Sequence, residues 1–140
     1  MKLMTFEVKG GRKGESRIGA LLDDLSVLSL QAAVALYLKE KEKEKDPYGL
    51  ASRYVPDDML SFLGRGKLGM DLARRCLRTV SKWQRTEKRA ISGVRKEPLI
   101  FPSSKVSLRA PVPRPGKIVA MGLNFRDHAE ENKVPIRRCP

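Results

Sequence analysis

The chain has 140 residues, 41% of them hydrophobic and 32% charged, which suits about one folded domain and excludes a wholly disordered protein. It contains no run of the roughly 18 apolar residues that a membrane-spanning helix needs, and its first residues lack the apolar stretch of a secretory signal. Its formal net charge of +13 makes anionic partners the first class to consider.

The first thirty residues predict a small antiparallel meander of three short strands. Apolar residues alternate over residues 2–8 and cluster over 17–22, as they do in half-buried strands. Gly10 and Gly14 lie between these segments and supply the positive φ angles that a hairpin loop needs. An acidic pair then turns the chain into a brief third strand at residues 27–28.

Two helices are predicted in the following segment. Residues 31–38 are rich in helix formers, and this helix continues into a run of alternating lysine and glutamate that we interpret as its solvated end. The Asp-Pro pair at residues 46–47 is expected to stop it. A second, short helix is predicted over residues 59–63, with Asp57 or Asp58 as its N-cap.

A longer helix is predicted from Gly69 or Met70 to about Lys88. Successive residues advance by about 100° around a helix, and on this scale one side is apolar while the opposite side is cationic. Cys76 and Trp83 fall on the apolar side, so we expect a core thiol and a core ring. The cationic face is formed by Arg74, Arg75, Arg78, Lys82, Arg85 and Arg89.

The cationic face supports one hypothesis for function, a basic non-enzymatic module that binds nucleic acid or another anionic surface such as acidic lipid or protein. It lies within residues 51–117, which hold sixteen Lys and Arg against five Asp and Glu. Clustered positive charges contact phosphates and make binding steeply dependent on salt. The chain has no zinc finger, aromatic-glycine RNA motif or clear helix-turn-helix, so we favour a solvated face over a nucleic-acid site.

From Ser92 onward the pattern changes. Five prolines between residues 98 and 115 interrupt the sequence, which predicts a connection between two units with one short strand at residues 106–108. A compact apolar strand is then predicted over residues 116–122.

His128 and Glu131 follow this strand, at the start of a stretch with helical character. They are three residues apart and so share a helix face. A carboxylate beside an imidazole orients the ring and stabilises its cation, which makes the pair a candidate general base.

The stretch from residue 110 to 131 reads APVPRPGKIVAMGLNFRDHAEE. It closely resembles the entry to the catalytic domain of the fumarylacetoacetate hydrolase family, whose members read Pro-Arg-Pro-Gly-Lys-Ile, a short apolar strand and Gly-Leu-Asn-Tyr-x-x-His. The segments at residues 1–6 and 17–21 resemble the N-terminal domain of that family, and the likeness is looser over residues 40–100. Phe125 replaces the usual tyrosine and lacks its hydroxyl.

The resemblance implies a concrete chemistry. Family members mostly cleave carbon–carbon bonds in acylpyruvates and related oxo acids, and some decarboxylate or isomerise such acids. A divalent metal, usually Mg²⁺ and otherwise Mn²⁺ or Ca²⁺, chelates the keto and carboxylate oxygens of the substrate. By position in the motif, His128 matches the histidine of the catalytic dyad and Glu131 matches its glutamate, while Asn124 receives no role.

The family takes its metal ligands from a Glu-x-Glu pair and a later Asp, all downstream of the dyad, and this sequence ends at Pro140. We therefore assign no metal ligand to it. Asp127, Glu130 and Glu131 are neighbours on one short turn, which does not make a preorganised octahedral Mg²⁺ site. The hypothesis is a truncated form of the enzyme that is inactive by itself.

The expected fold class is α+β. A small antiparallel domain with two or three helices is expected over residues 1–100, a Pro-rich connection over 101–117, and the first strand and lid of an incomplete β-rich catalytic domain over 118–140. We expect a small oxo-acid substrate and a homodimer for a full-length form, with neither membrane nor nucleic acid as partner. The two cysteines fit no zinc or disulfide spacing, so an intracellular setting, cytoplasmic or mitochondrial, is expected.

Overall fold

The structure is a computed structural model that describes residues 1–12, 14–86, 91–120 and 126–133. Its centre is a five-stranded antiparallel sheet with the strand order β4-β3-β2-β1-β5. Three strands follow one another in the sequence, namely β1 (Leu3–Val8), β2 (Arg17–Leu21) and β3 (Val27–Ser29). The predicted meander is therefore confirmed, and Gly10 in its first loop has the expected positive φ of 78°.

The two edge strands come from the Pro-rich segment. β4 (Ile100–Phe101) pairs with β3, and β5 (Val106–Leu108) pairs with β1. The strand at residues 106–108 is as predicted, but β4 is an addition. A strand of two residues has no periodicity, so only its pairing with a neighbour reveals it. The sheet therefore extends beyond residue 100.

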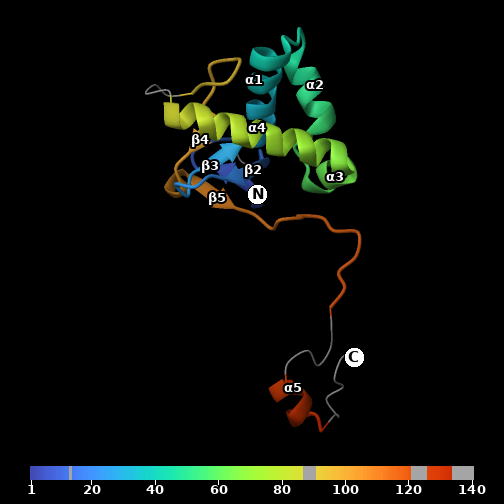
Figure 1. Cartoon of the computed structure of the whole chain (residues 1–140). Helices are drawn as coiled ribbons and strands as arrows, with labels where there is room; N and C mark the ends of the chain where they lie inside the picture. Colours follow the sequence, from blue (N-terminus) through green and yellow to red (C-terminus); the bar gives the residue numbers. More distant parts are fainter. Residues whose placement is uncertain (13, 87–90, 121–125, 134–140) are drawn as a thin grey trace.

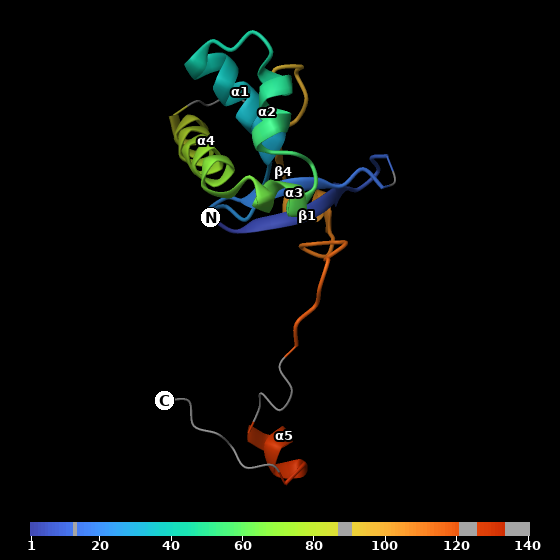
Figure 2. The same cartoon turned by 90° about the vertical axis from the view of Figure 1, so that its right-hand side faces the viewer.

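In the described part of the chain, four helices lie between β3 and β4. They are α1 (Leu30–Glu42), α2 (Pro47–Tyr54), α3 (Met59–Gly64) and α4 (Gly66–Thr86). Figures 1 and 2 show them together on one side of the sheet, with α4 crossing α1. The α+β class with an antiparallel sheet is confirmed, whereas the expected number of two or three helices is too low.

The additional helix is α2, and it begins where the sequence pattern predicts only the end of a helix. Asp46 is its N-cap, and the Asp46 carboxylate accepts a hydrogen bond of 3.0 Å from the backbone N–H of Gly49. Pro47 occupies the first helical position, where the missing N–H has no intrahelical partner in any case. α1 ends before this pair, at Lys43 with a left-handed φ of 56°.

The predicted break between the next two helices is confirmed. Asp58 caps α3, and its carboxylate accepts a 2.8 Å hydrogen bond from the backbone N–H of Ser61. Gly66 then adopts a φ of 59°, which a residue without a Cβ tolerates, and starts α4. α4 therefore begins three residues before the predicted Gly69.

The main hydrophobic core lies between the sheet and the helices. Sheet residues such as Ile18 and Leu28 meet helical residues such as Phe62 there. Side chains alternate between the two faces of a strand, so the second, smaller cluster occupies the opposite face. Its buried members are Phe6, Val27, Phe101 and Val106.

Beyond β5 the chain leaves the sheet, and α5 (Arg126–Glu131) lies apart from it in Figures 1 and 2. The strand predicted over residues 116–122 is not formed over 116–120, and 121–122 lie outside the described residues. Ile118 and Val119 are 85% and 90% exposed. The prediction fails there because a strand needs a neighbour for its backbone hydrogen bonds, and no described strand pairs with this segment.

Candidate functional site

The two predicted catalytic positions lie on α5. The backbone from Arg126 to Glu131 is helical, so positions 128 and 131 are one turn apart. Glu131 is exposed, and Asp127 in the first turn has the charge that favours a helix N-terminus. The side chain of His128 lies outside the described residues, so its pairing with Glu131 stays a prediction.

The described ranges do not assemble a metal site. They contain no group of three or more His, Cys, Asp or Glu side chains placed to hold an ion. The carboxylates of Asp127, Glu130 and Glu131 are exposed on one short helix. The described residues therefore do not fit the Mg²⁺ that the family resemblance implies.

The segment that leads to α5 is anchored on β1 before it departs. The buried hydroxyl of Thr5 donates a 2.8 Å hydrogen bond to the carbonyl of Pro111. Arg109 donates a 2.6 Å hydrogen bond to the carboxylate of Glu7, and this contact raises the pKa of the Arg109 guanidinium. The backbone N–H of Arg109 also donates to the carbonyl of Thr5 at 2.9 Å. We call residues 109–114 the anchored connector.

A small cavity of about 170 Å³ lies where the anchored connector passes the start of α3. The backbone N–H of Ser61 at this helix start lowers the pKa of Asp58, and the nearby charge of Arg114 lowers it further. The connector therefore also lies next to the start of α3. The cavity is lined by Thr5, Ser16, Asp57, Asp58, Met59, Pro113 and Arg114.

A cavity of about 280 Å³ opens at the N-terminal end of α1. Burial raises the pKa of the Asp57 carboxyl there, against smaller opposing effects of Gln31 and Arg17. Oε1 of Glu97 is buried and has no hydrogen-bond partner among the described residues. Arg17 already pairs with Glu15 at 2.6 Å. Side chains of both charge signs therefore line this cavity.

The predicted apolar side of α4 is confirmed. Cys76 is buried, and burial raises the pKa of its thiol to about 12, so it is an unreactive core residue. Trp83 is half-buried and packs against the core, with Nζ of Lys41 5.8 Å from the centre of its ring. Cys76 is therefore closed to a partner at the surface.

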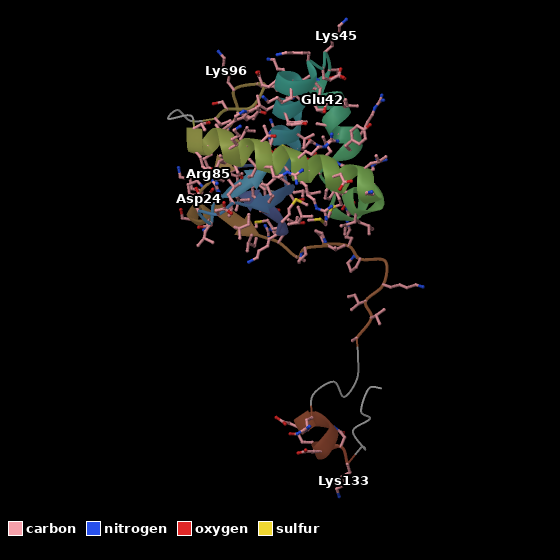
Figure 3. The ribbon with its side chains drawn as sticks, viewed as in Figure 1. Asp24, Glu42, Lys45, Arg85, Lys96 and Lys133 are labelled. Carbon is pink, nitrogen blue, oxygen red and sulfur yellow. The ribbon has the colours of Figure 1, made fainter. Side chains whose placement is uncertain are left out.

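The predicted cationic face is also confirmed in the described part of α4. Figure 3 shows Arg85 near the C-terminal end of this helix, beside Asp24. Arg89 lies outside the described residues. The exposed members are Arg74, Arg75, Arg78, Lys82 and Arg85. A binding role for this face stays a prediction.

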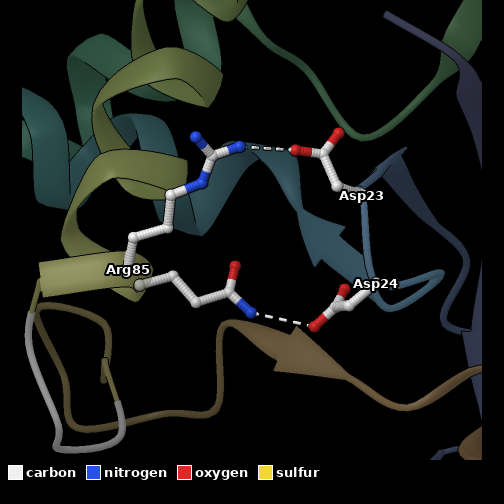
Figure 4. A network of polar contacts seen from close by, with 4 residues as sticks. Asp23, Asp24 and Arg85 are labelled. Atoms are coloured by element: carbon white, nitrogen blue, oxygen red, sulfur yellow. Dashed lines mark hydrogen bonds and ion pairs between the residues drawn. The ribbon is translucent and has the colours of Figure 1, made fainter.

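A polar network ties the end of α4 to the turn between β2 and β3 (Figure 4). Arg85 lies 2.9 Å from the carboxylate of Asp23, and Gln84 donates a 2.9 Å hydrogen bond to Asp24. Asp24 also accepts hydrogen bonds from the N–H and hydroxyl of Ser26, which lower the pKa of Asp24. The Arg85–Asp23 pair is exposed, so it contributes little to stability.

The sequence prediction gives no surface role to three exposed leucines on α3 and at the start of α4. Leu60 and Leu63 on α3 are 51% and 47% exposed, and Leu68 at the start of α4 is 72% exposed. No periodic signal marks them, because their exposure depends on how α3 and α4 meet the rest of the fold.

Similar proteins carry related names. The mitochondrial oxaloacetate tautomerase Fahd2a of Rattus norvegicus is 35% identical over 86 residues, 61% of the chain. The fumarylacetoacetate hydrolase domain-containing protein 2 homolog of Dictyostelium discoideum is 27% identical over 140 residues, 100% of the chain. The oxaloacetate tautomerase YisK of Bacillus subtilis is 26% identical over 115 residues, 81% of the chain. No protein-family model matches.

These relatives are much longer than the matched regions. The matches cover 22% of the rat protein, 34% of the Dictyostelium protein and 31% of the Bacillus protein. They confirm the resemblance to the fumarylacetoacetate hydrolase family that the motif at residues 110–131 predicts. Among the described residues, no helix combines the length and apolar character that crossing a membrane requires.

Proposed function

We propose that the protein works on a small oxo acid as part of a fumarylacetoacetate-hydrolase-family enzyme, and that its reaction is keto–enol tautomerisation of oxaloacetate. The observation that carries this proposal is the name oxaloacetate tautomerase on relatives from rat and Bacillus, which match 61% and 81% of the chain. Carbon–carbon bond hydrolysis, the reaction that the family resemblance implies most often, is the second candidate.

Tautomerisation moves one proton and consumes no second reactant. A base removes a proton from the carbon beside the ketone, and a proton is returned to the carbonyl oxygen to give the enol. In this proposal His128 takes up the proton, and Glu131 orients the imidazole and stabilises its cation. The same pair would activate water for hydrolysis, so the two candidate reactions share their residues and differ in the proton that the base removes.

The structure supports the assignment through the arrangement of its C-terminal segment. The helical backbone of α5 puts positions 128 and 131 one turn apart. The anchored connector defines where the segment bearing α5 leaves the sheet, because Thr5 and Glu7 hold Pro111 and Arg109. We propose that substrate contacts and metal ligands come from regions that the relatives have and that these matches do not cover.

The test is a chimera in which these 140 residues replace the matched segment of the Dictyostelium protein. Conversion of the enol to the keto form of oxaloacetate is followed by the loss of enol absorbance. His128→Ala should lower kcat by about 100- to 10,000-fold, the range for loss of a general base. Glu131→Gln should lower kcat less than His128→Ala does and should shift the pH profile of kcat. Lys133→Gln, a nearby exposed change, is the matched control and should keep full activity.

Product analysis separates the two candidate reactions. If the chimera cleaved an acylpyruvate and did not interconvert enol and keto oxaloacetate, its reaction would be hydrolysis and not tautomerisation. Full activity of the His128→Ala chimera would remove His128 from either mechanism. The 140-residue chain alone should be inactive, and measurable Mg²⁺-dependent turnover by it would contradict that expectation.

A further inference from the structure

We propose that the solvent-facing side of α4 and the adjoining end of α3 form a docking surface for an anionic lipid membrane. The surface combines three cations, Arg75, Arg78 and Lys82, with three exposed leucines, Leu60, Leu63 and Leu68. It involves neither α5 nor the proposed catalytic pair. It departs from the expectation that no membrane takes part.

Two of the cations and one leucine lie along one line of α4. Leu68, Arg75 and Lys82 are spaced by seven residues and lie near one line on the helix surface, and Arg78 lies about 60° around the helix from Arg75 on the same cationic face. With a rise of about 1.5 Å per residue, this line is about 21 Å long. The cations occupy about 10 Å of it, from Arg75 to Lys82, and so can contact more than one phosphate group of an anionic surface.

The three cations of this surface are available to a partner. Arg75, Arg78 and Lys82 are exposed, and the described residues offer no ion pair to any of them. Two other cations of the face do have carboxylate neighbours, since Arg74 lies 3.1 Å from Asp71 and Arg85 is held by Asp23. Docking along the line therefore breaks no existing ion pair.

The apolar side of the same helix is already in use. Leu72, Cys76 and Val80 are buried in the core, so α4 stays packed while its opposite side meets a partner. Binding at the docking surface therefore requires no unfolding of the helix.

The leucines favour lipid over nucleic acid. Leu60 and Leu63 are one turn apart on α3, and Leu68 follows after the positive-φ turn at Gly66. Exposed Arg65 and Lys67 flank that turn. Phosphates of a nucleic acid attract the cations but gain little from leucines. A lipid surface interacts favourably with both kinds of side chain, because leucines enter the acyl boundary while cations contact anionic headgroups.

The test is flotation of the full 140-residue chain with vesicles of pure phosphatidylcholine or of phosphatidylcholine mixed with phosphatidylserine. The chain should float with the anionic vesicles at low salt and not with the neutral ones. The triple variant Arg75→Gln, Arg78→Gln, Lys82→Gln should bind at least about tenfold more weakly, since each cation near an anionic surface contributes on the order of 1 kcal/mol. The matched control Lys2→Gln, Lys9→Gln, Lys105→Gln removes the same charge from exposed positions elsewhere and should retain most of the affinity.

A second variant separates lipid from nucleic acid. Leu60→Ser, Leu63→Ser, Leu68→Ser should weaken vesicle binding several-fold and leave binding to duplex DNA unchanged. Absence of binding to anionic vesicles at low salt would overturn the proposal. An equal loss in the matched control would overturn it too, because attraction would then follow net charge alone. If the leucine variant bound vesicles normally and the triple variant of Arg75, Arg78 and Lys82 lost DNA binding, the partner of this surface would be nucleic acid and not lipid. Circular dichroism confirms that each variant is folded.

Discussion

Thr5 in β1 and Pro111 in the anchored connector are joined by a 2.8 Å hydrogen bond although they are 106 residues apart in the sequence. Thr5 is only 2% exposed, so its hydroxyl has little access to water. Glu7, two residues further along β1, forms an ion pair with Arg109 and holds the same segment. The strand that opens the protein therefore positions the segment that leads to α5.

Thr5→Val should loosen the anchored connector. Valine has a similar shape but no hydroxyl, so the hydrogen bond to Pro111 is lost. The free energy of unfolding should fall by about 1 kcal/mol. Trypsin cleavage after Arg109 should become faster, and urea denaturation gives the change in stability. Thr79→Val is the matched control, because the Thr79 hydroxyl bonds only to Arg75 within its own helix. Unchanged cleavage in Thr5→Val would show that the bond does not hold the connector.

Gly19→Ala should destabilise the sheet. A Cβ at this position would lie 2.7 Å from Cγ1 of Val27 and 2.9 Å from Cδ1 of Phe6, both buried in the second hydrophobic cluster. Overpacking of this kind costs about 1–3 kcal/mol, measured from urea unfolding. Gly116→Ala is the matched control, because a Cβ there meets nothing within 4 Å. Equal stability of the two variants would mean that the cluster adjusts freely.

Asp57→Asn should stabilise the protein at neutral pH. Burial raises the pKa of this carboxyl in the folded state above its ordinary value. At pH well below that ordinary value both states are protonated and the group has no effect, whereas above the raised pKa the folded protein must hold a partly desolvated charge. The gain in unfolding free energy should therefore appear as pH rises and vanish in acid.

Urea unfolding of Asp57→Asn at acidic and neutral pH checks this dependence. The exposed change Asp23→Asn serves as the control and should have little effect, because its ion pair with Arg85 is solvated. A lower stability of Asp57→Asn at neutral pH would show that contacts of the carboxylate outweigh the cost of its burial.

Sequence patterns predict the elements that carry their own periodicity. The alternation over residues 2–8 predicts β1, and the 100° spacing predicts both faces of α4, including the buried Cys76. The start of α2 is missed because Asp46 and Pro47 suit both the end of one helix and the start of the next. β4 is missed because two residues gain strand character only from a partner distant in the sequence.

The candidate site, like the fold, could be predicted from the sequence only in part. A motif identifies positions 128 and 131, and their helical backbone is a local property that the structure provides in α5. The strand expected before them depends on neighbours, and none of the described strands pairs with residues 117–120. The exposed leucines at the α3–α4 turn are not predictable from periodicity, because exposure depends on how the two helices meet the sheet.

The two outer strands of the sheet have a consequence for shortened forms of the protein. β4 and β5 cover β3 and β1, yet both come from residues 100–108, after all four main helices. Cutting the chain at residue 100 would leave the backbone groups of β1 and β3 open to pairing with other copies. We therefore expect the smallest fragment that stays monomeric in solution to reach past Leu108.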